Sequence, residues 1–438
     1  MKADYLIIGN SAAGLSAAES IRLLDSHGSI LVLTEENFKN YSKPLITYYL
    51  AGKVNLDQMY YRSPAFYAQK NIMLCTDTCI VGMNTEKKEV ISAQGRKFSY
   101  NKLLIASGGI PVLPPIPVSG GGLLKDEMKK IEGIYTLTTL EDARRLKKYI
   151  EKNHIRKAVV LGAGLIGLKA AEACLELGLT IHLIELSDRI LAATFDHKAS
   201  KIMEARIEQK QGRIYTSNTI KQIKASQGTV EKLILADGKQ IDTNLLIAAV
   251  GVRPHTAFID AGTIETERGI IVDKHMQTTA EHVYAAGDVA SSTDILKKRA
   301  ENIAIWPLAV MQGRVAGMNM AGKRQEYGGG FFMNAVEIMG IPSISMGLSG
   351  PQESKDAEVL TQEDGSSSIY RKVVIEKNRI VGLIMLGHIE RAGIYAGLIK
   401  NRIDIGNIKE NIIREDFGLI QLPADYKKHL VVGEGIEV

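Results

Sequence analysis

The residues best suited to chemistry stand in two glycine-rich stretches, GNSAAG at 9–14 and GAGLIG at 162–167. A tight turn of small residues lets backbone N–H groups approach a pyrophosphate, and a helix that starts there offers partial positive charge. The second stretch keeps all three glycines of this pattern. The first has Ser11 in place of the middle glycine, and its hydroxyl can still donate to phosphate. The predicted contacts are Gly9, Ser11, Ala12, Ala13 and Gly14 in the first loop and Gly162, Gly164, Leu165, Ile166 and Gly167 in the second.

A carboxylate follows each loop at the spacing expected for an acid that binds a ribose hydroxyl. Glu35 lies twenty-one residues after Gly14, with Thr34 as its near rival for the role. Glu185 lies eighteen residues after Gly167. A carboxylate at Glu185 accepts hydrogen bonds from both ribose hydroxyls and repels a 2′-phosphate, and no arginine follows it immediately. The sequence therefore favours NADH over NADPH.

The elements that position these residues follow from the hydrophobic pattern. Short apolar runs at 4–9 and 157–161 precede the loops, helices follow them, and the second runs, SILVLTEE and TIHLIEL, contain or end in the acids. One glycine loop is a weak signal, because such turns are common before helices. Two loops in the same strand–turn–helix–strand–acid order are a strong one. The sequence thus predicts an α/β fold with two Rossmann-like dinucleotide-binding domains.

Composition narrows the class of protein. The chain has 438 residues, enough for two or three domains, and its 45% hydrophobic and 24% charged residues are typical of a soluble globular protein. The net charge of +5 is too mild to suggest nucleic acid. No apolar run approaches the ~18 residues of a membrane span, and the N-terminal run ends at Gly9, as in a buried strand rather than a signal peptide. We expect a cytoplasmic protein.

The three cysteines, Cys75, Cys79 and Cys174, are too few and odd in number for a disulfide scaffold, which favours a reducing compartment. If LCTDTCIV is one strand, Cys75 and Cys79 lie roughly 13 Å apart. A disulfide needs Cα atoms within about 7 Å. We therefore predict that these cysteines are free.

Three further stretches indicate a family: LLIASGGIPVLPPIP at 103–117, LLIAAVGVRP at 245–254 and VYAAGDV at 283–289. With the two glycine loops, they resemble the FAD- and NAD-dependent pyridine nucleotide–disulfide oxidoreductase superfamily over nearly the whole chain. The resemblance implies interleaved domains: FAD-binding residues 1–113, NAD-binding residues 114–244, FAD-binding residues 245–325, and a C-terminal α+β interface or dimerisation domain with a tail at 326–438. That last part resembles the branch of NADH oxidases, coenzyme A–disulfide reductases, rubredoxin reductases and the flavin portion of nitrite reductases.

The resemblance also implies further cofactor contacts. Asp288 would bind the FAD ribityl chain, and the helix that begins near Trp306 would face the pyrimidine end of the isoalloxazine, where its dipole favours anionic reduced flavin. Trp306 itself is either a flavin contact or a core aromatic. The remaining expected FAD contacts are Lys43, Pro44, Ile80, Ala106, Ser107, Gly108, Gly287, Pro307 and Leu308, and the remaining NAD contacts are Val250 and Gly251.

Residues 41–48 read YSKPLITY, where thiol-dependent relatives have a run that resembles YSRCGLPY. Pro44 stands at the cysteine and Lys43 at the arginine. Proline has no nucleophile, so thiol–disulfide chemistry at the flavin is not expected, and hydride would pass from nicotinamide C4 to flavin N5 without a catalytic side chain. Lys169 stands where the family often has glutamate. It would either raise the flavin potential together with Lys43, or point to solvent or pair with a nearby acid.

With no thiol relay, the resemblance implies that electrons pass between NAD(H) and a small redox protein, rubredoxin- or ferredoxin-like, or an iron–sulfur partner subunit. The chain would be a homodimer or the flavin subunit of a hetero-complex. A peroxide-forming NADH oxidase and a flavin-bearing, NADH-responsive scaffold subunit remain alternatives. Three basic clusters are either docking sites for an acidic partner or solvated faces: Lys297, Lys298 and Arg299; Arg371 and Lys372; Lys400 and Arg402. No metal site is expected.

Overall fold

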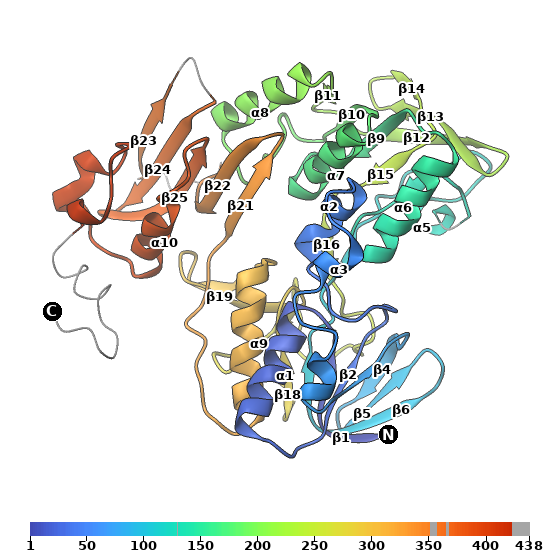
Figure 1. The fold of residues 1–438 in the computed structure, drawn as a ribbon, viewed down its shortest axis with the longest axis vertical. Coiled ribbons are helices and arrows are strands. Elements are labelled where there is room, and N and C mark those ends of the chain that lie inside the picture. The colour runs from blue at the N-terminus through green and yellow to red at the C-terminus, as the bar shows by residue number, and fades with distance from the viewer. Residues whose placement is uncertain (129, 351–356, 365–367, 423–438) are drawn as a thin grey trace.

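The computed structural model describes the chain except residues 129, 351–356, 365–367 and 423–438. Two α/β units stand one above the other, and a C-terminal unit lies beside the upper one (Figure 1). Short helical turns, η1 (Lys43–Leu45), α2 (Ile46–Leu50), α3 (Leu56–Met59) and α4 (Phe66–Gln69), connect β2 to β3 of the lower unit. In the described part of the chain, no helix is both long and apolar enough to cross a membrane.

The lower unit is built on a sheet with strand order β3-β2-β1-β6-β5-β4, and β18 also pairs with β6. The pairs β1–β2, β1–β6, β2–β3 and β18–β6 are parallel, whereas β4, β5 and β6 form an antiparallel edge. The strands are β1 (Lys2–Ile8), β2 (Ile30–Leu33), β3 (Ile72–Cys75), β4 (Ile80–Asn84), β5 (Glu89–Ser92), β6 (Lys97–Ile105) and β18 (Val283–Ala285). The strands predicted at 4–9 and 29–36 are therefore present as β1 and as the shorter β2.

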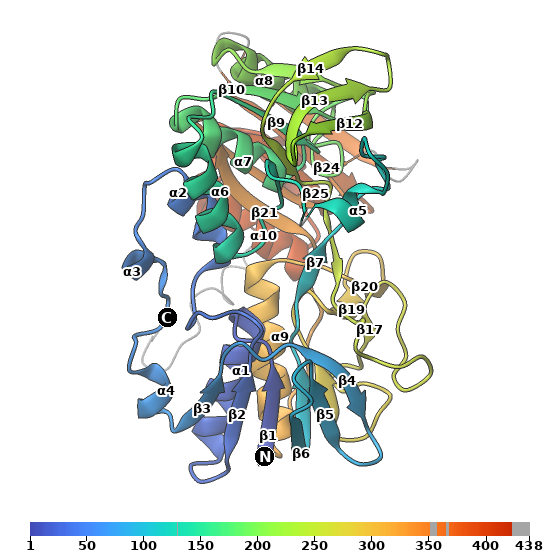
Figure 2. The same cartoon turned by 90° about the vertical axis from the view of Figure 1, so that its right-hand side faces the viewer.

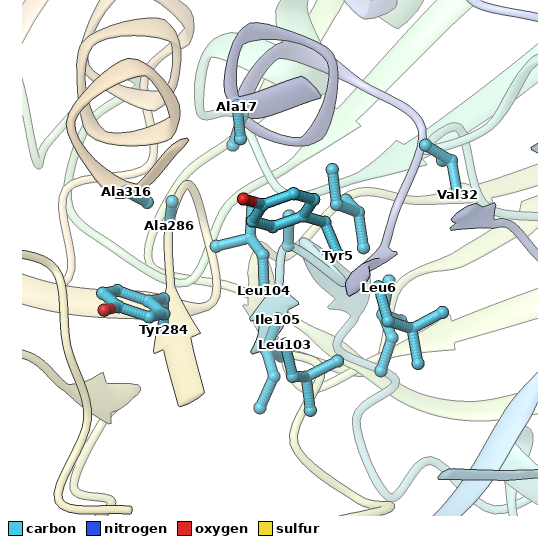
Figure 3. Packing of buried hydrophobic residues seen from close by; sticks show 14 of the residues in the cluster. Tyr5, Leu6, Ala17, Val32, Leu103, Leu104, Ile105, Tyr284, Ala286 and Ala316 are labelled. Atoms are coloured by element: carbon cyan, nitrogen blue, oxygen red, sulfur yellow. The ribbon is translucent and has the colours of Figure 1, made fainter. Parts of the chain in front are cut away.

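Helices α1 (Ala12–Leu24) and α9 (Trp306–Met320) pack against each other although they lie far apart in the sequence. A Cβ added to Gly313 or Gly317 would overlap the backbone of Ala13 or Ala17, so these glycines allow the two helix backbones to touch. Figure 3 shows the core beside these helices, where Leu6, Leu103 and neighbouring apolar side chains are fully buried. Burial of one such leucine contributes roughly 1.5–3 kcal/mol. The packing also brings Ala13 of the first glycine loop close to Gly287, two residues after β18.

The upper unit has a parallel sheet of order β11-β10-β9-β15-β8. Its elements are β8 (Ile134–Tyr135), β9 (Lys157–Leu161), β10 (Thr180–Ile184), β11 (Arg213–Tyr215), β15 (Leu246–Ala248), α5 (Leu124–Glu127), α6 (Leu140–Lys152), α7 (Leu165–Glu176) and α8 (His197–Gln209). A meander of β12 (Ile220–Ser226), β13 (Thr229–Leu235) and β14 (Gln240–Asp242) is attached to it. The second predicted strand–turn–helix–strand unit is present at its expected residues.

One predicted domain boundary is wrong. The expected boundary places residues 246–248 in the second FAD-binding segment, but β15 pairs with β9 and β8 of the upper sheet. An apolar run cannot show from sequence which of two parallel sheets it joins, because both bury such runs. The chain crosses back later, where β16 (Val252–Pro254) pairs antiparallel with β7 (Gly109–Pro111). Figure 2 shows β7 running between the two units.

The remaining elements complete the lower unit and the C-terminal unit. The lower unit adds β17 (Ile270–Ile271), β19 (Ala290–Asp294) and β20 (Arg299–Glu301). The C-terminal sheet has order β21-β22-β25-β24-β23, from β21 (Met333–Ile338), β22 (Ile341–Gly347), β23 (Glu358–Glu363), β24 (Tyr370–Glu376) and β25 (Arg379–Leu386). Helix α10 (Ala392–Lys400) packs on this sheet, followed by η2 (Gly406–Asn411) and η3 (Leu419–Gln421). The described part of residues 326–438 thus combines a sheet with helices, which agrees with the expected α+β character.

Candidate active site

The first glycine loop lies at the carboxyl end of β1, against the segment that follows β6. Gly9 has φ +115°, and a Cβ there would overlap the carbonyl of Ala106. A Cβ on Gly14 would overlap the carbonyl of Gly9. Ser11 precedes α1 but its side chain makes no capping hydrogen bond, so its hydroxyl stays available to a ligand. The loop therefore has the close backbone approach that a pyrophosphate site requires.

The segment after β6 is held by hydrogen bonds to the backbone of His255, the residue that follows β16. Ser107 Oγ donates a 2.8 Å hydrogen bond to the carbonyl of His255, and the N–H of His255 donates to the carbonyl of Gly108 at 2.9 Å. Gly108 has φ +71°, a conformation that favours glycine. The hydroxyl of Ser107 thus donates its proton within the protein and keeps only its acceptor lone pairs, and the cofactor contact of this residue stays a prediction.

Asp288 follows β18 at the same edge of the sheet. Burial raises the pKa of its carboxyl, and the nearby Lys43 ammonium acts in the opposite direction. Within the described residues its carboxylate has no hydrogen-bond partner, while Gly287 N–H is held by Gln312 Oε1 at 2.8 Å. A partly buried carboxylate without a protein donor fits a ligand that brings hydroxyl groups, as the ribityl chain of FAD does.

The segment of Pro44 lies beside this carboxylate. Lys43 Nζ is 3.5 Å from Glu36 Oε1, and Tyr41 donates a 2.6 Å hydrogen bond to Glu36 Oε2. The same Tyr41 hydroxyl accepts a 3.1 Å hydrogen bond from the N–H of Leu140, at the start of α6 in the upper unit. Pro44 is exposed. The chain thus presents a proline, not a nucleophile, at the predicted flavin edge.

The N-terminus of α9 lies near this edge too. Pro307 is exposed, Leu308 is buried, and Trp306 is partly buried with its ring edge-on to Tyr61 at 5.2 Å between centroids. Proline suits the first turn of a helix because its missing N–H would have no partner there. The Trp306–Tyr61 contact favours a packing role for Trp306, and a flavin contact stays a prediction.

The second glycine loop repeats the geometry of the first. Gly162 has φ +98°, and a Cβ there would overlap the carbonyl of Ala249 and lie 3.1 Å from Cα of Val250. A Cβ on Gly167 would overlap the carbonyl of Gly162. Gly251 has φ +115°, so residues 249–251 turn beside the loop as predicted. Gly164 and Ile166 are exposed and Leu165 is partly exposed where α7 begins.

Glu185 is tied to this loop. Its Oε2 accepts a 2.7 Å hydrogen bond from the N–H of Ala163, and its Oε1 accepts one of 2.8 Å from the N–H of Ser187. Each carboxylate oxygen keeps a further lone pair. The acid therefore stands beside the pyrophosphate loop with acceptors left for two ribose hydroxyls.

Two family models match the chain. The pyridine nucleotide-disulphide oxidoreductase model matches residues 3–313, and the rubredoxin NAD+ reductase C-terminal domain model matches residues 333–403. The chain belongs to the pyridine nucleotide-disulphide oxidoreductase family. The first match includes both glycine loops, and membership confirms the predicted fold, the oxidoreductase class, and FAD and NAD(H) as cofactors.

Relatives of known type cover most of the chain. It is 31% identical over 412 residues to an NADH-dependent phenylglyoxylate dehydrogenase subunit epsilon of Aromatoleum evansii, covering 93% of this chain and 94% of that protein. It is 29% identical to a nitrite reductase [NAD(P)H] of Bacillus subtilis (strain 168), covering 92% of this chain but 48% of that protein. A solved NAD-dependent persulfide reductase from A. fulgidus, 25% identical, superposes with a TM-score of 0.84 over 94% of this chain and 79% of that one.

Unlike the disulphide reductases from which the family takes its name, this member has no thiol at Pro44. All three cysteines are free, as predicted. Burial raises the pKa of Cys79, and the neighbouring Glu35 carboxylate raises it further; burial raises the pKa of Cys174 to about 12. Two of the three thiols are therefore protonated near neutral pH and are poor nucleophiles.

Cys75 and Cys79 do not share one strand. Strand β3 ends at Cys75, the chain turns through Asp77 at φ +49°, and β4 begins at Ile80. Aspartate tolerates this left-handed conformation better than most residues. Ile80 is 5% exposed and packs in the core of the lower unit, whereas Glu35 is exposed beside Cys79.

Lys169 pairs with a nearby acid. Its ammonium contacts the Glu172 carboxylate, donates to the carbonyl of Glu337 at 3.0 Å, and lies over the ring of Tyr48, 4.8 Å from the centroid. Glu172 in turn accepts the N–H of Met339 at 2.7 Å. The charge of Lys169 is therefore largely compensated, and its main contacts join α7 to α2 and to the C-terminal unit.

Sequence reasoning missed several polar groups around the first loop. Asn40 Nδ2 and Tyr61 Oη are buried without a partner in the described part of the protein, and Tyr67 donates to Asn10 Oδ1 at 2.8 Å. Buried polar atoms are normally hydrogen-bonded, so Asn40 and Tyr61 have capacity for a cofactor or water. No motif marked them, because their burial depends on the fold around them.

The three basic clusters differ from one another in burial. Arg371 is buried and donates to the carbonyls of Ile413 and Arg414, and Lys372 is buried within 3.4 Å of Asp196. Both alternatives predicted for this cluster, a docking site and a solvated face, are therefore wrong. In a second cluster, Lys297 and Arg299 both form ion pairs with the Glu301 carboxylate. Both Lys400 and Arg402 are exposed, and their role stays a prediction. Among the described residues, no group of His, Cys, Asp or Glu forms a metal site.

Proposed function

We propose that this protein is an NADH-linked FAD flavoprotein that exchanges electrons between NAD(H) and a small redox protein or an iron–sulfur partner subunit, without an active-site thiol. The observation that carries the proposal is the combination of Glu185, fixed on the second glycine loop, with Pro44 at the position of the redox cysteine. The first feature favours a nicotinamide dinucleotide as donor or acceptor. The second removes the thiol relay that disulfide substrates need.

The chain's own residues would mainly bind and orient. The backbone of the loop at Gly162 would bind the pyrophosphate of NAD(H), and Glu185 would bind its ribose. Leu165 would cover the flavin ring with an apolar side chain. Asp288 accepts hydroxyl groups of the FAD ribityl chain. When bound, FAD would supply the hydride-accepting and one- or two-electron chemistry that none of these side chains provides. No side chain needs to act as acid or base, so geometry supplies the catalysis.

The relatives support an acceptor that is a protein. The phenylglyoxylate dehydrogenase relative is named as a subunit of a larger enzyme and matches over nearly its full length. The C-terminal unit matches a domain named for rubredoxin NAD+ reductase. We therefore favour a flavin subunit of a hetero-complex or a carrier reductase over a free-standing oxidase. The three free cysteines support a reducing compartment such as the cytoplasm.

The test is anaerobic rapid mixing of the FAD-loaded protein with NADH, followed by reoxidation. Bleaching of the flavin absorbance within the mixing experiment, slow reoxidation by air and fast reoxidation by rubredoxin, ferredoxin or a viologen dye would support the proposal. Fast air oxidation with stoichiometric peroxide would replace it with a peroxide-forming NADH oxidase. Slow bleaching with an NADH-dependent change in oligomeric mass would replace it with a scaffold role.

A further inference from the structure

A pocket of about 330 Å³ lies between the C-terminal half of α6 and the segment that leads into β8. Tyr135 and Tyr149 form an aromatic wall, with ring centroids 5.3 Å apart and ring planes inclined by 47°. The hydroxyl of Tyr149 donates a 3.0 Å hydrogen bond to the carbonyl of Asn244, which fixes its ring. Tyr135 is partly exposed, so a ligand can reach its side chain. The pocket therefore offers a held aromatic surface to a flat ring.

One face of α6 supplies three cations to this pocket, Arg145, Lys148 and Lys152. Their spacing of three and four residues places them in a row on the helix. All three are exposed, and none forms an ion pair in the part of the chain that the structure describes. A fourth lining cation, Lys130, lies 3.0 Å from a carboxylate of α5. Among the described lining residues, Glu132 carries the one carboxylate, so positive charge dominates the pocket.

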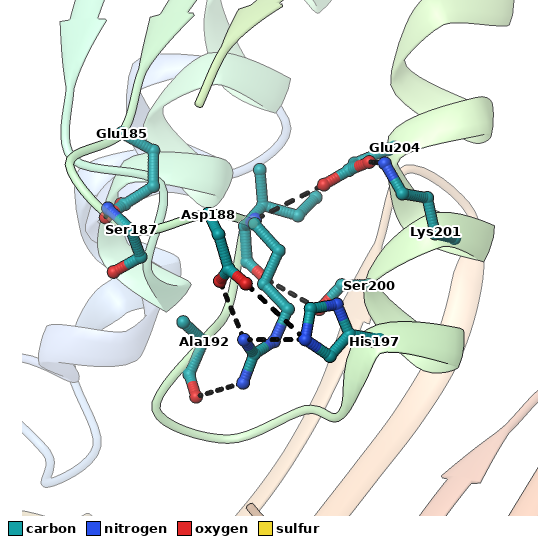
Figure 4. Close-up of polar contacts among 10 residues, drawn as sticks. Glu185, Ser187, Asp188, Ala192, His197, Ser200, Lys201 and Glu204 are labelled. Carbon is teal, nitrogen blue, oxygen red and sulfur yellow. Dashed lines mark hydrogen bonds and ion pairs between the residues drawn. The ribbon is translucent and has the colours of Figure 1, made fainter. Parts of the chain in front are cut away.

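This pocket and the second glycine loop lie at opposite ends of the upper sheet. Strands β8, β15 and β9 are parallel. The pocket includes the start of β8 and Asn153, which precedes β9, whereas the glycine loop follows β9 at Leu161. Figure 4 shows Glu185 beside Ser187 in the loop that follows β10, on the side of the glycine loop. The length of β9, roughly 16 Å, therefore separates the pocket from the place of NAD(H).

We propose that this pocket is a further nucleotide site, which binds the phosphate groups of a nucleoside mono- or diphosphate through Arg145, Lys148 and Lys152 and its base through Tyr135. Exposed cations of one sign concentrate an anion, and an arginine can hold a phosphate by two hydrogen bonds. An aromatic side chain provides a stacking surface for any base. The volume lies at the lower end of the range for ligand pockets, which suits a mononucleotide better than a dinucleotide.

The test is calorimetry of ADP binding to the full-length, FAD-loaded protein at saturating NAD⁺, which occupies the second glycine loop. The unaltered protein should bind ADP at one further site. Arg145→Gln combined with Lys148→Gln should weaken this binding by at least about tenfold, because the phosphates lose two cations. Tyr135→Ala should weaken it by about five- to tenfold through loss of the ring. Inorganic pyrophosphate, which has no ring, should bind more weakly than ADP by a similar factor.

Two further variants separate the pocket from general effects. Arg144→Gln removes a charge from the same helix, but Arg144 does not line the pocket and lies 3.6 Å from Glu141. This control should change ADP binding by less than about twofold. Tyr135→Phe keeps the ring and should bind ADP within about twofold of the unaltered protein. Because Arg145 and Lys148 are exposed, their double variant should keep the unfolding midpoint in urea.

Several results would overturn the inference. One is the complete loss of ADP binding when NAD⁺ is saturating. Another is an equal effect of Arg144→Gln and of the double variant, which would indicate long-range charge alone. Pyrophosphate that binds as tightly as ADP, or a Tyr135→Ala variant that binds ADP normally, would remove the role of the ring. None of these results bears on the proposed function, which depends on whether NADH bleaches the flavin.

Discussion

The contact between α1 and α9 gives a prediction with a built-in control. Gly313 lies in α9, where an added Cβ would overlap the backbone of Ala13, a rigid neighbour. Gly393 lies in α10, where a Cβ would meet nothing within 4 Å. Replacing either glycine by alanine lowers the conformational entropy of the unfolded chain equally. On this ground alone, each replacement should stabilise the folded protein by roughly 1 kcal/mol. Only Gly313→Ala forces two helices apart.

Overpacking of a tight contact costs about 1–3 kcal/mol, and sometimes more when the neighbour is backbone. Gly313→Ala should therefore lower the free energy of unfolding by up to about 2 kcal/mol net. Gly393→Ala should raise it by up to about 1 kcal/mol. Because Ala13 belongs to the first glycine loop, Gly313→Ala should also weaken FAD retention. Urea unfolding of both variants and flavin fluorescence after gel filtration measure these effects. Equal stability of the two variants would refute the claim that the α1–α9 backbones touch.

Three further predictions concern single side chains. Asp288→Ala should weaken FAD binding at least tenfold without weakening adenosine ligands at the NAD loop, and calorimetry with both would show it; unchanged FAD affinity would remove Asp288 from the flavin site. Lys169→Met should leave the flavin midpoint potential unchanged, since Glu172 already compensates the charge; a clear fall in a redox titration would restore a direct effect on the flavin. Burial lowers the pKa of His182 from 6.5 to about 4, so the folded protein favours the neutral imidazole. The stability that neutral His182 contributes is complete above pH 6.5, where the unfolded chain is also neutral at this position, and is lost as the pH falls toward 4. Between pH 7 and pH 5, the free energy of unfolding of the His182→Gln variant should therefore fall by about 1 kcal/mol less than that of the unaltered protein, after allowance for solvent screening. Urea titrations at both pH values measure this difference, and an equal fall in the two proteins would contradict the prediction.

The glycine loops were predictable because each depends on local chemistry. Gly9 and Gly162 need positive φ and a bare Cα, which only glycine supplies readily, and such needs leave a mark in the sequence. The acids after them are marked by spacing along one strand. The positions of the glycine loops and of the acids could therefore be predicted from the strand–turn–helix–strand unit alone.

Features that depend on distant partners were not predictable. The strand at 246–248 joins the upper sheet through β9 and β8, and nothing in an apolar run names its neighbours. Lys372 reads as a surface lysine until Asp196, far away in sequence, is found beside it. Tyr41 links Glu36 to the N–H of Leu140 across the two units. Each of these depends on tertiary contacts, which override local pattern.

The two nucleotide loops are also placed relative to each other by backbone. Gly9 abuts the carbonyl of Ala106, and Gly162 abuts that of Ala249. Three residues after each carbonyl the chain enters the ribbon in which Gly109–Pro111 pairs antiparallel with Val252–Pro254. The main-chain hydrogen bonds of this ribbon thus join the segment that contacts the first glycine loop to the segment that contacts the second. If the proposed hydride transfer depends on geometry alone, this short ribbon helps to set that geometry, and Pro44 lies outside the ribbon.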